Sequence, residues 1–316
     1  MTTAIAEPQS LPRTIVRSKW FRLTIQLVLG GGILVAVVVR VGTGPFVHGL
    51  LSLDGRSIGA AVLLGAIATG AAAWRWQLIA GRLGVGLRWT TAVGLYYQSQ
   101  FLNCVLPVGV LGDAHRAMTH GRSVDSIGRA SRAVVIERSA GQAVQIALAL
   151  IVLAFFGKEF EGFVLAAVAV GLAVLVVAGI TAGAASTRVR RALRNELDEL
   201  RAGLGTTAGF TRVAVASVIV VACHIAIFAI ATNAVGASVP PARMPAVALV
   251  VLLAASIPFN VGGWGPREGA AGWAFAVAGF GASAGVAAST LYGVLAFISV
   301  APGAIVLMTR RKEESS

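Results

Sequence analysis

Six long stretches of the chain contain no Asp, Glu, Lys or Arg, and they dominate its pattern of hydrophobic and polar positions. They cover residues 23–39, 57–74, 139–157, 162–187, 213–242 and 269–309. A helix that crosses the hydrocarbon core of a bilayer needs about 20 apolar residues. Each stretch therefore predicts a transmembrane helix. The last stretch is too long for one helix, so it predicts a full span near 286–308 that follows another helical arm.

The composition excludes a soluble globular protein. Hydrophobic residues make up 57% of the chain and charged residues only 12%, and the mean hydropathy is +0.82. A soluble domain has no way to bury so much apolar surface. We therefore predict an all-α polytopic membrane protein.

Two further hydrophobic segments are broken by proline and glycine and end in opposite charges. The first runs from Pro107 to Arg116, and the second runs from Pro258 to Glu268. They lie about half a chain apart, and in a membrane protein interrupted segments at corresponding positions of two halves point to a substrate site. We call residues 89–116 the first motif and residues 244–281 the second motif.

The net charge of +13 indicates membrane orientation rather than nucleic-acid binding, because Lys and Arg of short loops gather on the cytoplasmic side. With both termini inside, the cytoplasmic segments hold 21 of the 26 Lys and Arg residues. The outside then keeps only Arg40, Arg56, Lys158 and Arg243, while Arg267 belongs to the second motif. We therefore predict a multi-pass protein of the cell (plasma) membrane with both termini in the cytoplasm.

This orientation places the two motifs on opposite sides of the bilayer. Residues 89–112 have basic flanks at both ends and should enter and leave from inside, whereas residues 244–281 should begin and end outside. We predict two inverted re-entrant helical hairpins beside about six full transmembrane helices, nominally eight membrane segments. The alternative is that Pro107 and Pro258 merely kink ordinary transmembrane helices.

The predicted organisation is one membrane domain over residues 20–310, made of two pseudo-repeats. Between them, leucines recur on one face of a helix near 186–212. Its basic start suits the surface of an anionic inner leaflet, so we expect a cytoplasmic amphipathic helix that joins the repeats. Residues 1–19 predict a disordered cytoplasmic tail, and residues 311–316 a second cytoplasmic tail.

The residues of the two motifs carry a resemblance to a known family. The first motif contains Gln100-Phe-Leu-Asn103-Cys-Val-Leu-Pro107 and Gly112-Asp113-Ala-His-Arg116, with Glu137-Arg138 downstream. The second contains Ile257-Pro258 and then Gly262-Gly263-Trp-Gly265-Pro-Arg267-Glu268. In combination, over residues 18–310, these motifs resemble the lysylphosphatidylglycerol synthase transmembrane family, a flippase-like membrane domain.

The resemblance implies a free-standing domain that binds or moves lipids with phosphate-containing headgroups. These would be an anionic phospholipid, an aminoacylated lipid, or a polyprenyl or hopanoid-type lipid. Relatives that synthesise lysylphosphatidylglycerol carry a large soluble domain after the membrane part, whereas this sequence ends at Ser316, so we do not expect synthase activity. Membrane lipids are the expected partners, and a homo-oligomer or an envelope-biosynthesis enzyme stays open as another.

Arginine suits such a headgroup, because its planar fork of donors matches phosphate and stays charged. Arg116 and Arg267 are thus the leading candidates, and each has a carboxylate close in sequence. Asp113 and Arg116 can face each other at i, i+3 on a helix. Neighbouring helical residues point apart, so Glu268 is expected to pair elsewhere than with Arg267, with Arg138 as one partner.

The candidate headgroup-binding residues span both motifs and their flanks. They are Asn103, Pro107, Gly112, Asp113, Arg116, Glu137, Arg138, Pro258, Gly262, Gly263, Gly265, Arg267 and Glu268. The glycines, Gly109 among them, permit positive φ and close approach of a ligand to backbone amides, and helix starts after these loops would aim their positive dipole ends at an anion. The alternatives are tight helix packing for the glycines and positions at the membrane interface for the charged residues.

Catalytic and cofactor motifs find little support in the sequence. Cys104 and Cys223 lack the spacing of a zinc or disulfide framework, and four histidines, His48, His115, His120 and His224, are scattered rather than spaced as metal ligands. His224 fits helix packing better than a proton relay. No nucleotide-binding glycine loop is visible. We expect no cofactor and do not favour an enzyme.

The sequence therefore predicts a lipid flippase or headgroup-binding transporter of the inner membrane. Transport would be passive or coupled to an ion gradient, with Asp113, Glu137 and Glu268 as the buried groups able to carry protons. A membrane transferase that acts on a lipid-linked substrate, with those carboxylates as acid or base, is one alternative. A non-transporting scaffold of the cell envelope is another.

Overall fold

The computed structural model describes residues 51, 53–106, 109–162, 205–256 and 265–314, and the regular secondary structure within these residues is helical. Four long apolar helical segments have the length and composition to cross a membrane: Gly55–Arg82, Ile127–Phe156, Thr207–Ala234 and Ala282–Met308. The expectation of an all-α polytopic membrane protein is confirmed. The predicted spans over 23–39 and 162–187 lie outside the described residues, apart from residue 162.

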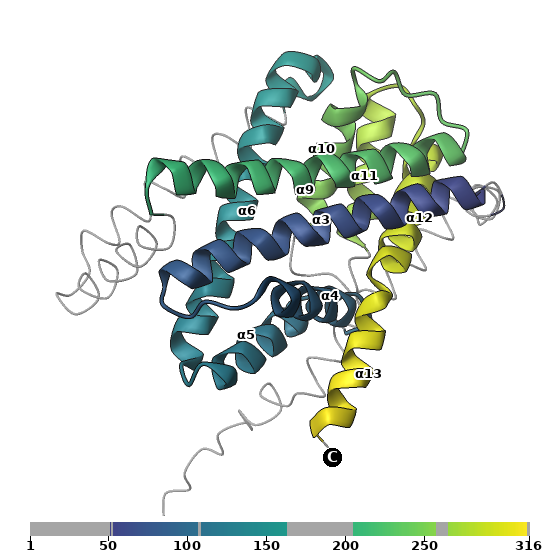
Figure 1. Ribbon diagram of the computed structural model, residues 1–316. Coiled ribbons are helices and arrows are strands. Elements are labelled where there is room, and N and C mark those ends of the chain that lie inside the picture. Colours follow the sequence, from purple (N-terminus) through teal and green to yellow (C-terminus); the bar gives the residue numbers. More distant parts are fainter. Residues whose placement is uncertain (1–50, 52, 107–108, 163–204, 257–264, 315–316) are drawn as a thin grey trace, which may run out of the picture.

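The first three long segments are single helices, labelled α3 (Gly55–Arg82), α6 (Ile127–Phe156) and α9 (Thr207–Ala234) in Figure 1. The fourth is α12 (Ala282–Val300), which continues into α13 (Pro302–Glu314). At 1.5 Å per residue, a helix of 28 residues such as α3 is about 42 Å long. That length exceeds the hydrocarbon core of a bilayer, which is about 30 Å thick.

Several helices run beyond the stretches that lack charge. α3 continues through Arg75 to Arg82, and α6 begins before Glu137 and Arg138. These charges are therefore parts of long helices rather than of loops. Likewise residues 207–212, predicted as the end of the surface amphipathic helix, form the first turns of α9; residues 186–204 lie outside the described part of the chain.

The long helices α3 and α9 lie side by side and run in opposite directions (Figure 1). The start of α9 lies beside the end of α3, since a Cβ added at Gly205 would fall 2.8 Å from the Arg82 guanidinium carbon. We call this end of the bundle the Arg82 end. The opposite end carries Asp54, which caps α3 by accepting a hydrogen bond from the Ser57 N–H at 2.8 Å.

Each motif folds as a pair of shorter helices that pack against each other. In the first motif, α4 (Trp89–Val105) is followed by α5 (Leu111–Ser123). In the second, α10 (Met244–Ala255) is followed by α11 (Pro266–Val277). The interruption falls where proline and glycine predicted it, although Pro107, Pro258, Gly262 and Gly263 themselves lie outside the described residues.

The two helical hairpins start from opposite ends of the bundle. α4–α5 begins and returns at the Arg82 end, where the His120 imidazole Nε2 donates to the Val85 carbonyl at 2.7 Å. α10–α11 begins and returns at the other end, where the Arg243 guanidinium lies 5.0 Å from the Phe280 ring centre. The inverted arrangement thus agrees with the prediction. Re-entry from the two faces of a bilayer stays a prediction that follows from it.

The buried core has two main parts. One joins α9, α10, α11 and α12 around Phe228, Phe275 and Leu291. The other joins α3, α4, α5, α6 and the start of α9 around Trp76 and Leu95. Each hairpin is therefore packed into its own half of the core, and α3 and α9 contribute to both halves. A short 3₁₀ helix, η1 (Lys158–Phe160), follows α6.

Candidate functional site

The first motif contributes to a cluster of five charged side chains inside the helix bundle, which we call the first charge cluster. Arg75 comes from α3, Asp113 and Arg116 from α5, and Glu137 and Arg138 from α6. Glu137 follows Ile127 by ten residues, which places it about 15 Å along the helix axis. Glu137 therefore lies well inside α6 rather than in its first turns.

Glu137 is the centre of the first charge cluster, and its side chain is fully buried. Its Oε1 accepts hydrogen bonds from the Nε of Arg75 at 3.0 Å, from a second nitrogen of Arg75, and from the Tyr96 hydroxyl at 3.1 Å. Its Oε2 accepts from Arg116 Nη2 at 3.0 Å. Two arginines therefore share one carboxylate. This satisfies the requirement that a buried charge be paired and hydrogen-bonded.

Arg116 is fully buried between two aromatic rings. Its guanidinium carbon lies 4.6 Å from the Trp76 ring centre and 4.3 Å from that of Tyr96, within the range of cation–π attraction. The same Nη2 donates to Asp113 Oδ1 at 3.0 Å, as predicted from their spacing. Within the described residues, Nε and Nη1 of Arg116 have no hydrogen-bond partner, so the two rings compensate for missing acceptors.

Asp113 links the buried pairs to the edge of the first charge cluster. It accepts from the Ser99 hydroxyl at 2.9 Å and from the Asn103 amide at 3.3 Å, both on α4, and it pairs with Arg138 Nη2 at 2.6 Å. Asn103 also accepts from the Gly112 N–H at 2.7 Å. These contacts hold the two helices of the first hairpin together at its tip.

Gly112 is needed for close packing rather than for positive φ. A Cβ at this position would overlap the Ser99 carbonyl. By contrast, Gly109 and Gly265 do have positive φ, of 59° and 111°. Gly265 directly precedes α11, and Gly109 lies two residues before α5. Positive φ therefore occurs at these two positions, packing explains Gly112, and the approach of a ligand to the backbone here stays a prediction.

Arg138 differs from the other arginines of the cluster because its side chain is 48% exposed. It lines two adjoining cavities, of about 220 and 580 Å³, which also share Gly109 and Ala255. Each is far larger than a single water molecule requires. Asp113 lines the larger cavity, together with Ser139 and Gln142 of α6.

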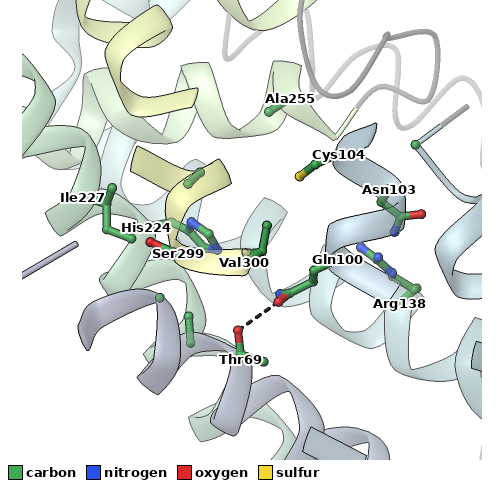
Figure 2. Close-up of a pocket in the computed structure, with 14 residues that line it drawn as sticks. Thr69, Gln100, Asn103, Cys104, Arg138, His224, Ile227, Ala255, Ser299 and Val300 are labelled. Atoms are coloured by element: carbon green, nitrogen blue, oxygen red, sulfur yellow. Dashed lines mark hydrogen bonds between the residues drawn. The ribbon is translucent and has the colours of Figure 1, made fainter. Parts of the chain in front are cut away.

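The smaller cavity lies where α3, α4, α6, α9, α10 and α12 meet, and Figure 2 shows the side chains around it. Thr69 donates to Gln100 Oε1 at 2.9 Å on one side, and Asn103, Cys104 and His224 also line the space. These residues are polar although they lie in the interior of apolar helices. The cavity thus combines these polar groups with apolar lining residues such as Ile227 and Val300.

The second motif forms a separate charged pair, the second charge cluster, in which the prediction about Glu268 was wrong. Arg267 donates from Nε and Nη2 to Glu268 Oε1 at 3.0 and 2.6 Å. The long arginine side chain bends back along the first turn of α11, so neighbouring residues meet after all. The Glu268 Oε2 also accepts from the Gly265 N–H at 2.6 Å, and Arg138 pairs with Asp113 instead.

The N-termini of α5 and α11 therefore each have a carboxylate of the chain itself in their first turn. Glu268 accepts from the backbone at the start of α11, and Asp113 lies in the first turn of α5. A carboxylate here is stabilised by the positive end of the helix dipole. A ligand anion at either helix start would therefore have to displace a carboxylate.

Neighbouring glycines make room for two of the buried arginines. A Cβ at Gly141 of α6 would lie 2.6 Å from Arg75 Nη1, and one at Gly293 of α12 would overlap the Arg267 guanidinium. Arg75 also donates to the Ser217 hydroxyl at 2.8 Å, and Arg267 to the Ser289 hydroxyl at 3.1 Å. Both arginines are thus built into helix interfaces.

Sequence reasoning missed Arg75, Tyr96 and Tyr292, and it assigned His224 to helix packing. The Tyr292 hydroxyl and His224 Nδ1 are hydrogen-bonded at 2.9 Å, and Arg267 lies over the Tyr292 ring at 5.3 Å. Arg75 could have been found from its position, because it directly follows the charge-free stretch 57–74. A charged residue next to an apolar membrane segment is usually paired with an opposite charge.

One ion pair and one helix cap lie near the helix ends. Arg243 pairs with Glu159 at 2.5 Å and joins the loops before α10 and after α6. Burial raises the pKa of Glu159, but the hydrogen bond and charge of Arg243 outweigh it, so the pKa lies below its ordinary value. The pKa of Asp54 is also lowered, by its hydrogen bonds from Ser57.

The described structure defines a polytopic helical membrane protein with two inverted hairpins, a charge cluster at each hairpin, and a cavity beside the first hairpin that is lined by both polar and apolar residues. Comparison with protein families then identifies the family of the chain. The chain belongs to the family described as the lysylphosphatidylglycerol synthase TM region, whose model matches residues 23–303. This confirms the resemblance carried by the two motifs, and it indicates a function connected with membrane lipids. No curated protein matches the chain.

Proposed function

We propose that the protein binds the anionic headgroup of a membrane lipid in the two adjoining cavities and moves that lipid across the bilayer. The observation that carries the proposal is the half-exposed Arg138, which lines both cavities. The first charge cluster contains three arginines and two carboxylates, a net charge of +1. An anionic headgroup at Arg138 would neutralise this charge.

Arg138 is proposed as the direct contact, with Asn103, Ser139 and Gln142 as further polar groups around the headgroup. Arg116 and Arg75 would act as supports, because both are buried and bound to Glu137. Arginine binds phosphate through charge-assisted hydrogen bonds, which are stronger than neutral ones. The lipid chains would remain among the apolar helix surfaces.

The state of the carboxylates favours transport over a transferase. Asp113, Glu137 and Glu268 are each bound by at least one arginine. A general acid or base must reach the proton that it transfers, whereas the oxygens of these carboxylates are engaged by arginine donors. Transport needs no such chemistry from these residues, only their charge and position.

A translocation assay in proteoliposomes tests the proposal. We would follow loss of the protected inner-leaflet signal of a headgroup-labelled phosphatidylglycerol, with the unmodified protein, Arg138→Ala and Arg129→Ala. Arg129 is an exposed arginine on the same helix that lines neither cavity, so it controls for the change in net charge. A charged hydrogen bond contributes about 1.5–3 kcal/mol, roughly ten- to a hundredfold in affinity.

The expected result is faster signal loss with the unmodified protein than with empty liposomes, a strong reduction in Arg138→Ala, and near-normal rates in Arg129→Ala. A rate equal to that of empty liposomes for the unmodified protein would contradict transport. Equal rates for all three proteins would contradict the role of Arg138.

A further inference from the structure

The acidic residues predicted to carry protons are poorly placed for that task. Glu137 accepts from two arginines, Asp113 is bound by Arg116 and Arg138, and Glu268 accepts from Arg267. Protonating any of them would leave an arginine without its counter-charge inside the bundle. That loss is costly in a medium of low dielectric constant.

His224 is a titratable group in a different position. It lies within α9, lines the smaller cavity together with Arg138, and is partly exposed to that space (Figure 2). Its Nδ1 is hydrogen-bonded to the Tyr292 hydroxyl at 2.9 Å. Within the described part of the chain no hydrogen-bond partner of Nε2 is found, and no carboxylate pairs with the ring. Histidine changes charge close to neutral pH.

The buried and cavity-lining arginines on the helices around His224 are already paired with carboxylates: Arg75 with Glu137, Arg138 with Asp113, and Arg267 with Glu268. α12 contributes Tyr292, and α11 places Arg267 over the Tyr292 ring. α3 directs Arg75 to Ser217 on α9, where Glu137 of α6 is its counter-charge. Around the cavity itself the titratable lining consists of Arg138, Cys104 and His224.

These surroundings make the charge of His224 depend on what fills the cavity. Since the imidazole lies inside the helix bundle and has no carboxylate partner among the described residues, its neutral form is favoured when no anion is bound. An anionic group between Arg138 and the imidazole places a negative charge beside the ring and favours the protonated form. The bound anion would then have a second cation beside it.

We propose that His224 takes up one proton when an anionic headgroup enters the cavity and releases it when the headgroup leaves. This inference rests on the proposed function and adds the coupling ion to it. The proton comes from water in the cavity and binds the free Nε2, while Nδ1 stays with Tyr292. One negative charge and one proton enter together, so the net charge of the site is unchanged by binding.

Calorimetric titration of the full-length protein in zwitterionic detergent tests this coupling. The probe is a short-chain phosphatidylglycerol, titrated between about pH 6 and 8, on either side of the ordinary imidazole pKa of about 6.5, in buffers of different ionisation enthalpy. The unmodified protein should bind more weakly as the pH rises, by up to about tenfold per pH unit for one linked proton, and should take up protons from the buffer. In His224→Gln both the pH dependence and the proton uptake should disappear.

His115→Gln is the matched control, because His115 lies on α5 and lines neither cavity; it should behave like the unmodified protein. A second readout needs no substitution in the measured sample. In ¹⁵N-histidine NMR spectra at pH 7, the signal that is missing in His224→Gln should move toward its protonated form when the probe is added to the unmodified protein.

The outcomes separate this inference from the proposed function. Binding that requires Arg138 but keeps its pH dependence in His224→Gln would overturn the proton role alone. An unchanged His224 signal on saturation with the probe would do the same. No binding of the probe by the unmodified protein at any pH would overturn both.

Discussion

Replacing Glu137 by Gln should destabilise the protein more than any other single change of one charge in the first charge cluster. The side chain is fully buried, and its two oxygens accept from Arg75, Arg116 and Tyr96. Since both oxygens face an arginine donor, the NH₂ group of glutamine would meet an N–H group in either orientation. Two buried arginines would also lose their shared counter-charge, and the cluster's net charge would rise from +1 to +2.

Breaking one partner out of a buried ion pair costs about 3–5 kcal/mol. We therefore expect Glu137→Gln to lower the free energy of unfolding by this amount, measured by reversible unfolding of the detergent-solubilised protein in mixed micelles with increasing SDS. The natural control is Glu159→Gln, which makes the same chemical change in the pair with Arg243, a partner that is 37% exposed. Exposed pairs contribute about 0.2–1 kcal/mol.

The comparison is decisive because it holds the chemistry constant and changes the burial. If Glu137→Gln and Glu159→Gln lowered the free energy of unfolding equally, the buried cluster would not have the role assigned to it. A loss below about 1 kcal/mol for Glu137→Gln, within the range of exposed pairs, would likewise refute the reasoning.

Three further expectations follow from individual contacts. Tyr96→Phe should lower the free energy of unfolding by about 1 kcal/mol, less than Glu137→Gln, because it removes a single neutral donor; SDS unfolding measures both. Gly112→Ala should reduce stability and loosen the tip of the first hairpin, which hydrogen exchange of the α4–α5 backbone would measure. Gly128→Ala, where a Cβ meets open space, should leave that exchange unchanged. The folded-state pKa of Glu159 is lowered, so the stability that its carboxylate contributes is present above the unfolded-state pKa of about 4.3 and is lost as the pH falls through the folded-state value. The free energies of unfolding of Glu159→Gln and of the unmodified protein should therefore converge at low pH. A difference that stays constant with pH would count against the ion pair.

The parts of the fold that follow from local pattern were predictable from the sequence. Charge-free stretches fixed the long helices, and proline and glycine fixed the break in each hairpin. The flanking charges anticipated that α4–α5 and α10–α11 start from opposite ends. Asp113 and Arg116 were paired correctly because their spacing alone brings them together on a helix.

Contacts across the sequence were not predictable in this way. Arg75 and Glu137 are 62 residues apart, and His224 and Tyr292 are 68 apart, so nothing local indicates that they meet. The pairing of Arg267 with Glu268 was predicted wrongly because a rule for side chains within a helix was applied to its first turn. There the arginine can bend back to a carboxylate that already accepts from the backbone.

The sequence also did not show which arginines are buried in ion pairs and which one is exposed. Arg116 and Arg267 stand in the motifs and attracted attention in the sequence, yet both are buried in ion pairs. Arg138 lies outside the first motif, and its partial exposure at two cavities follows only from how α6 packs against α4 and α10. The candidate site is therefore centred one helix away from the motif that predicts it.

The most direct test of the account asks whether an anionic lipid occupies the cavity beside Arg138. Cys104 lines that cavity and is partly exposed, whereas Cys223 is buried, so the rate at which a small thiol reagent modifies Cys104 reports occupancy. We would compare nanodiscs of phosphatidylglycerol and of phosphatidylcholine, in a Cys223→Ser background, for the unmodified site, Arg138→Ala and Arg129→Ala. The account predicts several-fold slower modification in phosphatidylglycerol, with the protection lost in Arg138→Ala and kept in Arg129→Ala. Equal rates in the two lipids for the unmodified site would contradict it.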